Sequence, residues 1–291
     1  MPRRSWNPLG FVVVLGFALG CSKAPIDARL PVRGLSLHIV CRGEGRPPVV
    51  LDSGLGNDSA IWSSVLPDIA RSSQVCAYDR AGMGASSRPA PRPHSNRLMA
   101  EELHELLRAA KIPEPYVLVG HSIGGANIRY LAAKSPRAVA GMVMVDSVSE
   151  HQPARFWALL PEATLSEFKQ GLARMPEGID FDTFRDGLEQ LATVSPSLGN
   201  LPLVVLARGK SLPPPSGIRP EGEKQLEQSW RSMQDDLARL SGNSAYLVVE
   251  NAGHHIQLDR PDVLVAAINE LLASVRQGRP LNREAIAAKQ N

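Results

Sequence analysis

Short apolar runs alternate with helical apolar patterns along most of the chain. The strand-like segments are residues 35–40, 49–51, 75–78, 116–119, 142–145, 203–206 and 246–249. The last four are nearly continuous apolar runs, which fit strands buried on both faces of a parallel sheet. Apolar residues at helical spacing predict helices near residues 99–110, capped by Ser95, and near residues 264–275, behind Pro261. This alternation predicts a doubly wound α/β sheet.

The alternation breaks once, at residues 150–200. This segment has no convincing strand pattern, and its apolar residues recur at helical spacing. We therefore expect a helical insertion of about 50 residues between two strands of the sheet.

The N-terminal sequence predicts an export signal. Two arginines precede an apolar run at residues 9–19, which is too short to span a bilayer and is typical of a signal peptide over residues 1–20. The sequence Ala-Leu-Gly-Cys that ends at Cys21 resembles the lipobox of bacterial lipoproteins, which implies a lipid anchor on Cys21. Ser22 resembles an outer-membrane signal, so we expect the periplasmic side of that membrane. Ordinary cleavage near the same point would instead give a periplasmic or secreted protein, with Cys21 lost or free.

Composition and charge narrow the function classes. The 291 residues are 43% hydrophobic and 21% charged, as in globular proteins. Lys and Arg number 32 against 29 Asp and Glu, so the net charge of +3 gives no basic stripe, and we expect no nucleic-acid partner. Three cysteines exclude a dense disulfide scaffold and a four-cysteine zinc site. We also find no H-E-x-x-H motif, and we expect neither a metal nor a cofactor.

A candidate nucleophile lies in the sequence Gly-His-Ser-Ile-Gly at residues 120–124. It follows a strand and precedes a helical segment, which is the context of a nucleophile elbow centred on Ser122. The alternative is a plain glycine-rich turn. With the Asp-Arg-Ala-Gly-Met-Gly-Ala-Ser run at residues 79–86, which matches D-R-x-G-x-G-x-S, the chain resembles the α/β-hydrolase superfamily over residues 32–276. The resemblance implies a structural role for the 79–86 run.

The resemblance also implies a fold and the division of the chain into parts. We expect a mostly parallel eight-stranded sheet flanked by helices, with a small helical cap. The expected parts are a signal peptide (1–20), a linker after lipidated Cys21 (21–31), the core in two pieces (32–149 and 201–276), the cap (150–200) and a C-terminal tail (277–291).

The resemblance also implies which histidine and which acid would act with Ser122. The family places its histidine after the last strand, directly after glycine, which selects His254, with His255 as a minor alternative. The usual acid position, the loop 207–211, has no carboxylate. A family variant places the acid after the sixth strand, which selects Asp146. Asp146 could instead cap a turn. The fallback acids are Glu221, Asp235 and Asp236.

Two backbone N–H groups are predicted to form the oxyanion hole. One belongs to Ile123, directly after the nucleophile. The other belongs to Leu55, in the loop after the third strand, where the family usually has His-Gly and this chain has Ser-Gly.

The resemblance also implies a disulfide between Cys41 and Cys76. In the family sheet, the second and fourth strands are antiparallel neighbours, so facing residues lie within disulfide reach. Export would supply an oxidising compartment. The alternative is two buried thiols.

These residues predict a serine hydrolase of the carboxylesterase type (EC 3.1.1). It would form an acyl-enzyme with a small or medium apolar ester. Peptidase or amidase activity, acyltransfer, and a non-catalytic binding protein of the same fold are the alternatives. The serine argues against haloalkane dehalogenases and epoxide hydrolases, which use aspartate at this position. Beyond the signal peptide, every Phe lies in the 150–200 insertion, and one or two of them are predicted to line an acyl pocket.

Overall fold

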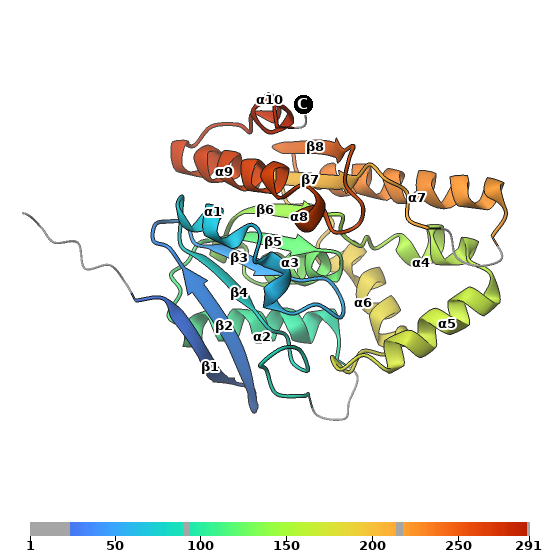
Figure 1. Cartoon of the computed structure of the whole chain (residues 1–291), viewed down its shortest axis with the longest axis horizontal. Coiled ribbons are helices and arrows are strands. Elements are labelled where there is room, and N and C mark those ends of the chain that lie inside the picture. The colour runs from blue at the N-terminus through green and yellow to red at the C-terminus, as the bar shows by residue number, and fades with distance from the viewer. Residues whose placement is uncertain (1–23, 90–93, 214–217, 290–291) are drawn as a thin grey trace, which may run out of the picture.

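Eight strands form one sheet at the centre of the computed structural model, which describes residues 24–89, 94–213 and 218–289 (Figure 1). Their bounds are β1 Ile26–Val32, β2 Leu35–Arg42, β3 Val49–Asp52, β4 Val75–Tyr78, β5 Tyr116–His121, β6 Val139–Val145, β7 Leu203–Arg208 and β8 Ser244–Val249. The strand order is β1-β2-β4-β3-β5-β6-β7-β8. β2 is antiparallel to β1 and β4, and the other neighbours are parallel. The predicted mostly parallel eight-stranded sheet is confirmed.

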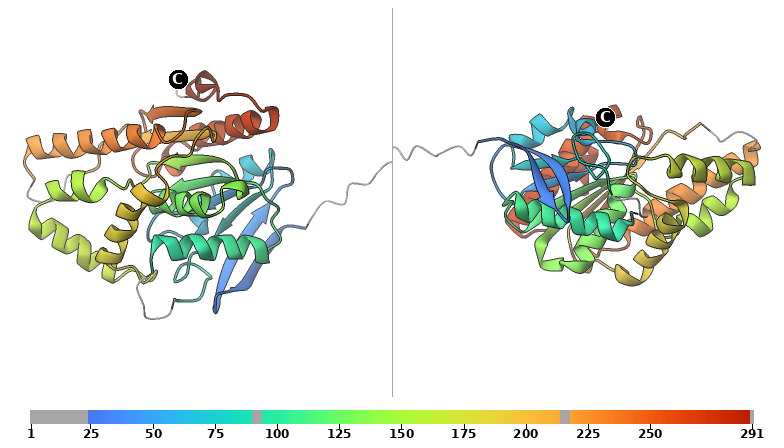
Figure 2. Two further views of the ribbon diagram at one scale, coloured as in Figure 1. Left: turned by 180° about the vertical axis from the view of Figure 1, so that it is seen from behind. Right: turned by 90° about the horizontal axis from the view of Figure 1, so that it is seen from below.

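Helices cover both faces of this sheet. Their bounds are η1 Ser59–Trp62, α1 Leu66–Ala70, α2 Asn96–Ala109, α3 Ile123–Lys134, η2 Pro136–Ala138, α4 Gln152–Arg155, η3 Trp157–Leu159, α5 Glu162–Ala173, α6 Phe181–Val194, α7 Pro220–Ala238, α8 Ile256–Asp259, α9 Pro261–Gln277 and α10 Arg283–Ala287. Successive strand residues point to opposite faces, so Leu118 packs with α2 and α3, whereas Val117 and Val119 pack with α1 and α9. Figures 1 and 2 show these helix pairs on opposite sides of the sheet. Burial on both faces explains why the central strands are almost wholly apolar.

The predicted helical insertion contains α4, η3, α5 and α6. These helices lie beyond the carboxyl ends of β5 to β8 (Figure 1). Trp157 is the centre of their packing, with ring centroids 4.9–5.6 Å from those of three phenylalanines: Phe168, Phe181 and Phe184. An aromatic cluster thus joins the helices of the cap to one another.

Two segments outside the predicted core are part of the fold, which corrects the expected boundaries. Residues 26–31 of the predicted linker belong to β1, which pairs with β2 along its whole length. Alternate residues of β1 face inward, and its exposed positions include Pro31, which an edge strand tolerates. In the predicted tail, α10 packs against α9 and buries Ile286 completely. One short apolar contact of this kind leaves little periodic signal in the sequence.

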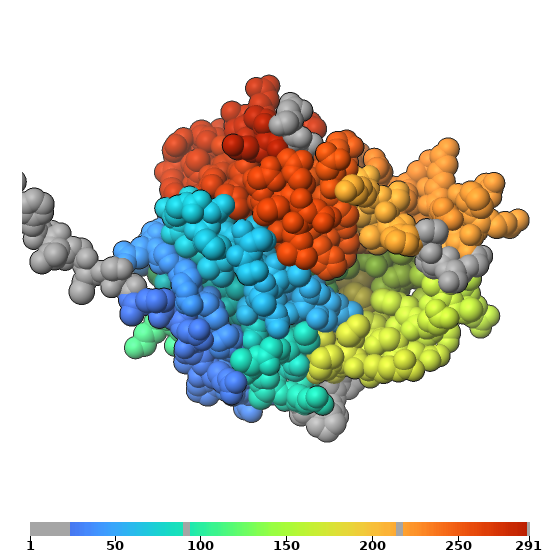
Figure 3. Space-filling model, viewed as in Figure 1, coloured from blue at the N-terminus to red at the C-terminus, as the bar shows by residue number. Residues whose placement is uncertain are grey.

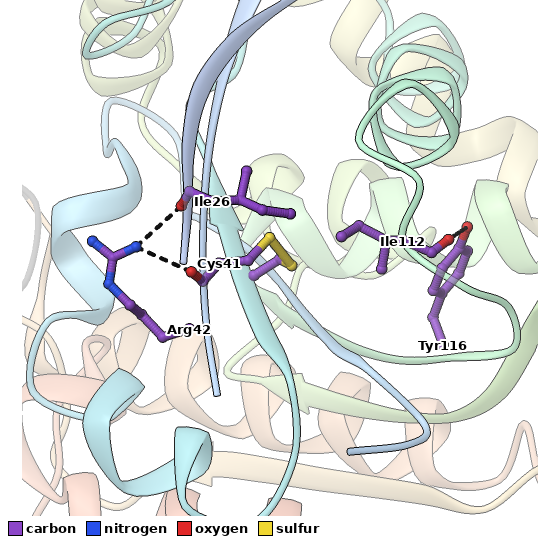
Figure 4. The surroundings of a disulfide bond; sticks show 6 residues. Ile26, Cys41, Arg42, Ile112 and Tyr116 are labelled. Carbon is purple, nitrogen blue, oxygen red and sulfur yellow. Dashed lines mark hydrogen bonds between the residues drawn. A yellow bond between two sulfur atoms is a disulfide. The ribbon is translucent and has the colours of Figure 1, made fainter. Parts of the chain in front are cut away.

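The structure joins Cys41 of β2 to Cys76 of β4 in a disulfide. The two residues are direct partners in the antiparallel register, and their Cα atoms are 4.1 Å apart. Figure 4 shows the bridge with Ile26 and Tyr116 around it. Arg42 donates hydrogen bonds of 3.0 Å to the carbonyl oxygens of Ile26 and Cys41. Both cysteines are buried, so the bridge lies in the interior, where it joins the second and third strands of the sheet order.

Reduction of this disulfide should destabilise the protein by about 3–4 kcal/mol, because it closes a loop with a sequence separation of 35 residues. Urea unfolding of the oxidised protein and of a Cys41→Ala/Cys76→Ala double variant measures this difference. Thiol titration of the unfolded, unreduced mature chain should find neither cysteine reactive. Two reactive thiols would show that the bridge does not form.

In the part of the chain that the structure describes, no helix combines the length and apolar character needed to cross a bilayer. The predicted signal peptide and the predicted lipid attachment at Cys21 lie outside the described residues.

Candidate active site

Ser122 stands at a sharp turn between β5 and α3. Its φ of 53° lies in a region that residues other than glycine rarely adopt, which costs about 1–3 kcal/mol and persists only where neighbours enforce it. Two flanking glycines, Gly120 and Gly124, make this turn possible. A Cβ atom on Gly120 would lie 2.6 Å from the Gly124 backbone, and one on Gly124 would lie 2.3 Å from the Asp52 carbonyl oxygen. The G-x-S-x-G pattern thus reflects the close approach of three backbone segments around Ser122.

The two segments that carry the predicted oxyanion donors lie beside Ser122. Ile123 is the first residue of α3, so its N–H has no acceptor within the helix and lies at the positive end of the helix dipole. Leu55 is in the loop that follows β3. A Cβ atom on Gly54 would be 3.3 Å from the Ser122 Cβ, which places this loop directly against the nucleophile.

Asp146 directly follows β6 and is completely buried. Its carboxylate accepts hydrogen bonds from His254 Nδ1 at 2.6 Å and Trp230 Nε1 at 2.7 Å. Arg208 donates both its backbone N–H and its guanidinium to the same carboxylate, at 3.1 Å each. Burial alone would raise the pKa of Asp146, but His254, Arg208 and Trp230 lower it below its usual value. Asp146 is therefore an anion at neutral pH.

His254 is in the loop between β8 and α8, with its side chain 24% exposed. An ionised carboxylate can only accept, so His254 Nδ1 donates the proton to Asp146 and Nε2 is left to act as a base. The structure thus brings Asp146 and His254 together as an acid–base pair of the kind found in serine triads.

A second histidine supports the position of the first. His121 Nε2 donates a hydrogen bond of 2.9 Å to the carbonyl oxygen of His254, and the two ring centroids are 4.6 Å apart. Burial, reinforced by the nearby His254, lowers the pKa of His121 to about 3. His121 is therefore a neutral, structural hydrogen-bond donor.

The alternative residues do not join this group. Glu221 is exposed on the first turn of α7. Asp235 pairs with Arg239, and Asp236 pairs with Arg155. The His255 ring lies 5.4 Å from the His254 ring, but of these two histidines only His254 bonds to Asp146 in the described structure.

Sequence reasoning missed Arg208 and Trp230 as partners of the acid. Arg208 also bonds to Glu227 at 2.8 Å and stacks on the Trp230 ring at 4.6 Å. A signal for Arg208 was present, because an arginine that ends an otherwise apolar strand needs a buried anion nearby. Trp230 lies on α7, and no local motif connects it to residue 146.

An apolar cavity of about 570 Å³ lies between the cap and α7. Its walls include Phe156, Trp157, Leu160, Phe168, Leu226 and, on the side of the triad acid, Arg208. In Figure 3, the surface is recessed between the yellow-green cap and the orange α7. Phe156 and Phe168 line this cavity, but Ser122 is not among its lining residues, so the predicted acyl pocket over the nucleophile stays a prediction.

Comparisons with known proteins agree with the fold. A family model described as "alpha/beta hydrolase fold" matches residues 47–230. An uncharacterized protein of Bacillus subtilis, YqjL, is 29% identical over 252 residues, which cover 86% of this chain and 94% of the relative. An esterase from Thermogutta terrifontis has a TM-score of 0.62 at 20% identity, covering 87% of this chain and 99% of its own. The epoxide hydrolase CorEH has a TM-score of 0.59 at 18% identity, covering 87% and 100%. The two solved structures show a shared fold.

Proposed function

Because the chain belongs to the α/β-hydrolase family, we propose that it is a serine hydrolase that cleaves small or medium carboxylic esters through an acyl-enzyme. The observation that carries this proposal is the 2.6 Å hydrogen bond between Asp146 and His254, formed beside the strained elbow at Ser122. Epoxide hydrolases share the fold, but they use an aspartate where this chain has Ser122.

In the proposed mechanism, His254 Nε2 removes the Ser122 hydroxyl proton as Oγ attacks the ester carbonyl carbon. The backbone N–H groups of Ile123 and Leu55 stabilise the resulting oxyanion. When the tetrahedral intermediate collapses, the bond to the alkoxide breaks and His254 gives it the proton. Water then attacks the acyl-enzyme with His254 again as the base, which releases the acid and restores Ser122. Asp146 stays ionised throughout and stabilises the imidazolium.

A fluorophosphonate probe and a series of nitrophenyl esters of increasing acyl length test the proposal together. The wild type should react with the probe and hydrolyse the esters, and Ser122→Ala should do neither. Hydrolysis of matched anilides at a comparable rate would favour an amidase, and transfer to an added alcohol would favour an acyltransferase. Absence of labelling and turnover in the wild type would point to a binding protein.

The cavity between the cap and α7 is the proposed acyl pocket. Phe168→Ala should shift preference toward longer acyl chains, changing the ratio of kcat/KM for octanoyl and butanoyl esters by about 3–10-fold, because it enlarges an apolar wall. Phe184→Ala is the matched control, since Phe184 packs on Trp157 but does not line the cavity. Equal chain-length ratios in the two variants would show that acyl chains bind elsewhere.

We further propose that the mature protein is exported and anchored in the cell envelope by lipid on Cys21. The basic and apolar N-terminal sequence and the Cys41–Cys76 bridge support an oxidising, extracytoplasmic location. Metabolic labelling with a palmitate analogue tests the anchor: the wild type should be labelled and Cys21→Ser should not.

A further inference from the structure

Three charged side chains are buried together behind the loop that carries Leu55. Asp52 at the end of β3, Arg80 after β4 and Glu177 of the cap are each no more than 3% exposed. Arg80 Nη1 donates to Asp52 Oδ1 at 2.9 Å, and Nη2 donates to Glu177 Oε1 at 3.0 Å. Burying three charges is unfavourable unless they are paired and hydrogen-bonded, so a cluster of this kind needs an explanation.

Arg80 also fixes the backbone of the oxyanion loop. Its Nη1 donates to the carbonyl oxygen of Ser53, and its Nη2 donates to that of Gly54, both at 2.6 Å. The peptide bond between Gly54 and Leu55 is planar, so its carbonyl oxygen and its N–H point in opposite directions in the trans form. By holding the Gly54 oxygen, Arg80 therefore directs the Leu55 N–H away from itself. A flip of this peptide would break the bond to Arg80.

Asp52 sets the orientation of Arg80. Its Oδ2 accepts from the Tyr78 hydroxyl at 3.0 Å and from Asn127 at 3.2 Å, which leaves Oδ1 for the guanidinium. The anion is thus held by β4 and α3, two elements of the rigid core. Through Asp52 and Arg80, the loop that carries Leu55 is therefore anchored to the sheet.

Glu177 provides the second anchor, from the cap. It lies between α5 and α6, and its Oε1 accepts from both Arg80 and the backbone N–H of Gly56, the latter at 2.9 Å. The chain just before it is also in close contact with the core. A Cβ atom on Gly82 would lie 2.0 Å from the Pro176 carbonyl oxygen, and one on Gly56 would lie 3.7 Å from Met175 Sδ. One carboxylate thus joins the cap to the residues on both sides of the Leu55 peptide.

We infer that Glu177 and Arg80 are positioning residues, which hold the Leu55 N–H in the oxyanion hole only while the cap is docked on the core. This inference rests on the proposed serine mechanism for its kinetic effect. Neither residue touches the substrate in this account. Their contribution acts through the backbone of residues 53–56.

Glu177→Met is the main test, because it keeps the side-chain length but removes both acceptors. We expect kcat to fall by about 10–100-fold with KM within about twofold, which is less than deletion of an oxyanion donor outright. The affinity for a boronic acid, which forms an anionic tetrahedral adduct on Ser122, should fall by the same factor as kcat/KM. Glu177→Gln keeps an acceptor oxygen and should restore most of the loss. Arg80→Lys should reproduce the Met phenotype, because one ammonium cannot replace four guanidinium contacts.

Glu270→Met is the matched control. Glu270 Oε1 also accepts from an arginine, Arg279, and from a backbone N–H, that of Asn282, but it lies on α9 away from the elbow. The Glu270→Met variant should lower the free energy of unfolding without changing kcat or the affinity for the boronic acid.

Hydrogen–deuterium exchange of the peptide that contains residues 53–57 tests the positioning role of Glu177 separately from the proposed ester hydrolysis. If exchange is faster in Glu177→Met than in the wild type and in Glu270→Met, the result supports Glu177 as the residue that holds this loop, whether or not esters are substrates. Unchanged exchange, or a kcat equal to that of the wild type despite faster exchange, would overturn the inference. A wild type that hydrolyses no ester would instead refute the proposed function, and exchange would still decide whether Glu177 holds the loop.

Discussion

Replacement of Ser122 by alanine should lower kcat/KM for a nitrophenyl ester by about 10⁴–10⁶-fold, because no other group can form the acyl-enzyme. His254→Ala should have an effect of similar size, and the double variant should be little worse than either single one, since triad members act as a unit. Steady-state hydrolysis at pH 8 measures all three.

His255→Ala is the control for this experiment. His255 is next to His254 in sequence and its ring lies nearby, but Asp146 bonds to His254. The His255 variant should therefore retain activity within about tenfold of the wild type. If His255→Ala lost as much activity as His254→Ala, the choice between the two histidines would be wrong.

Asp146→Asn should reduce kcat by about 10⁴-fold while leaving the fold intact. The asparagine amide would donate to His254 Nδ1, which forces the imidazole into the tautomer whose Nε2 carries a proton and cannot act as a base. The substitution also removes the anion that stabilises the imidazolium. Kinetics of the purified variant, with circular dichroism to check folding, tests this expectation.

Glu221→Gln is the matched control for the acid. It makes the same chemical change at an exposed position of α7, and activity should stay within about twofold of the wild type. Full activity in Asp146→Asn, or a large loss in Glu221→Gln, would assign the acid to another carboxylate.

The parts of the site that could be predicted from sequence are those with a local geometric requirement. Ser122 needs glycines at fixed offsets because backbone segments meet there, so its pattern is readable in five residues. His254 follows glycine at the end of the last strand. Asp146 was predicted by the absence of a carboxylate after β7, a weaker signal, and the structure places it within 2.6 Å of His254.

The supporting residues could not be predicted because tertiary packing alone brings them to the site. Trp230 reaches Asp146 across 84 positions of sequence, and Glu177 reaches Gly56 across 121. Neither stands in a motif, and Glu177 lies in the turn between α5 and α6. Similarly, β1 was predicted as linker because a short edge strand with exposed Asp27 and Arg29 has little apolar content.

Three imidazoles meet at the base of the active site, yet they do not form a polycation. Burial and the neighbouring His254 keep His121 neutral at any pH at which the protein would work, and burial together with His254 also lowers the pKa of His255. The positive charge that arises on His254 during turnover is therefore not opposed by a permanent one 4.6 Å away. The proton that His254 takes up on Nε2 faces the reacting groups, while the Asp146 anion balances the new charge from the opposite edge of the ring, through Nδ1.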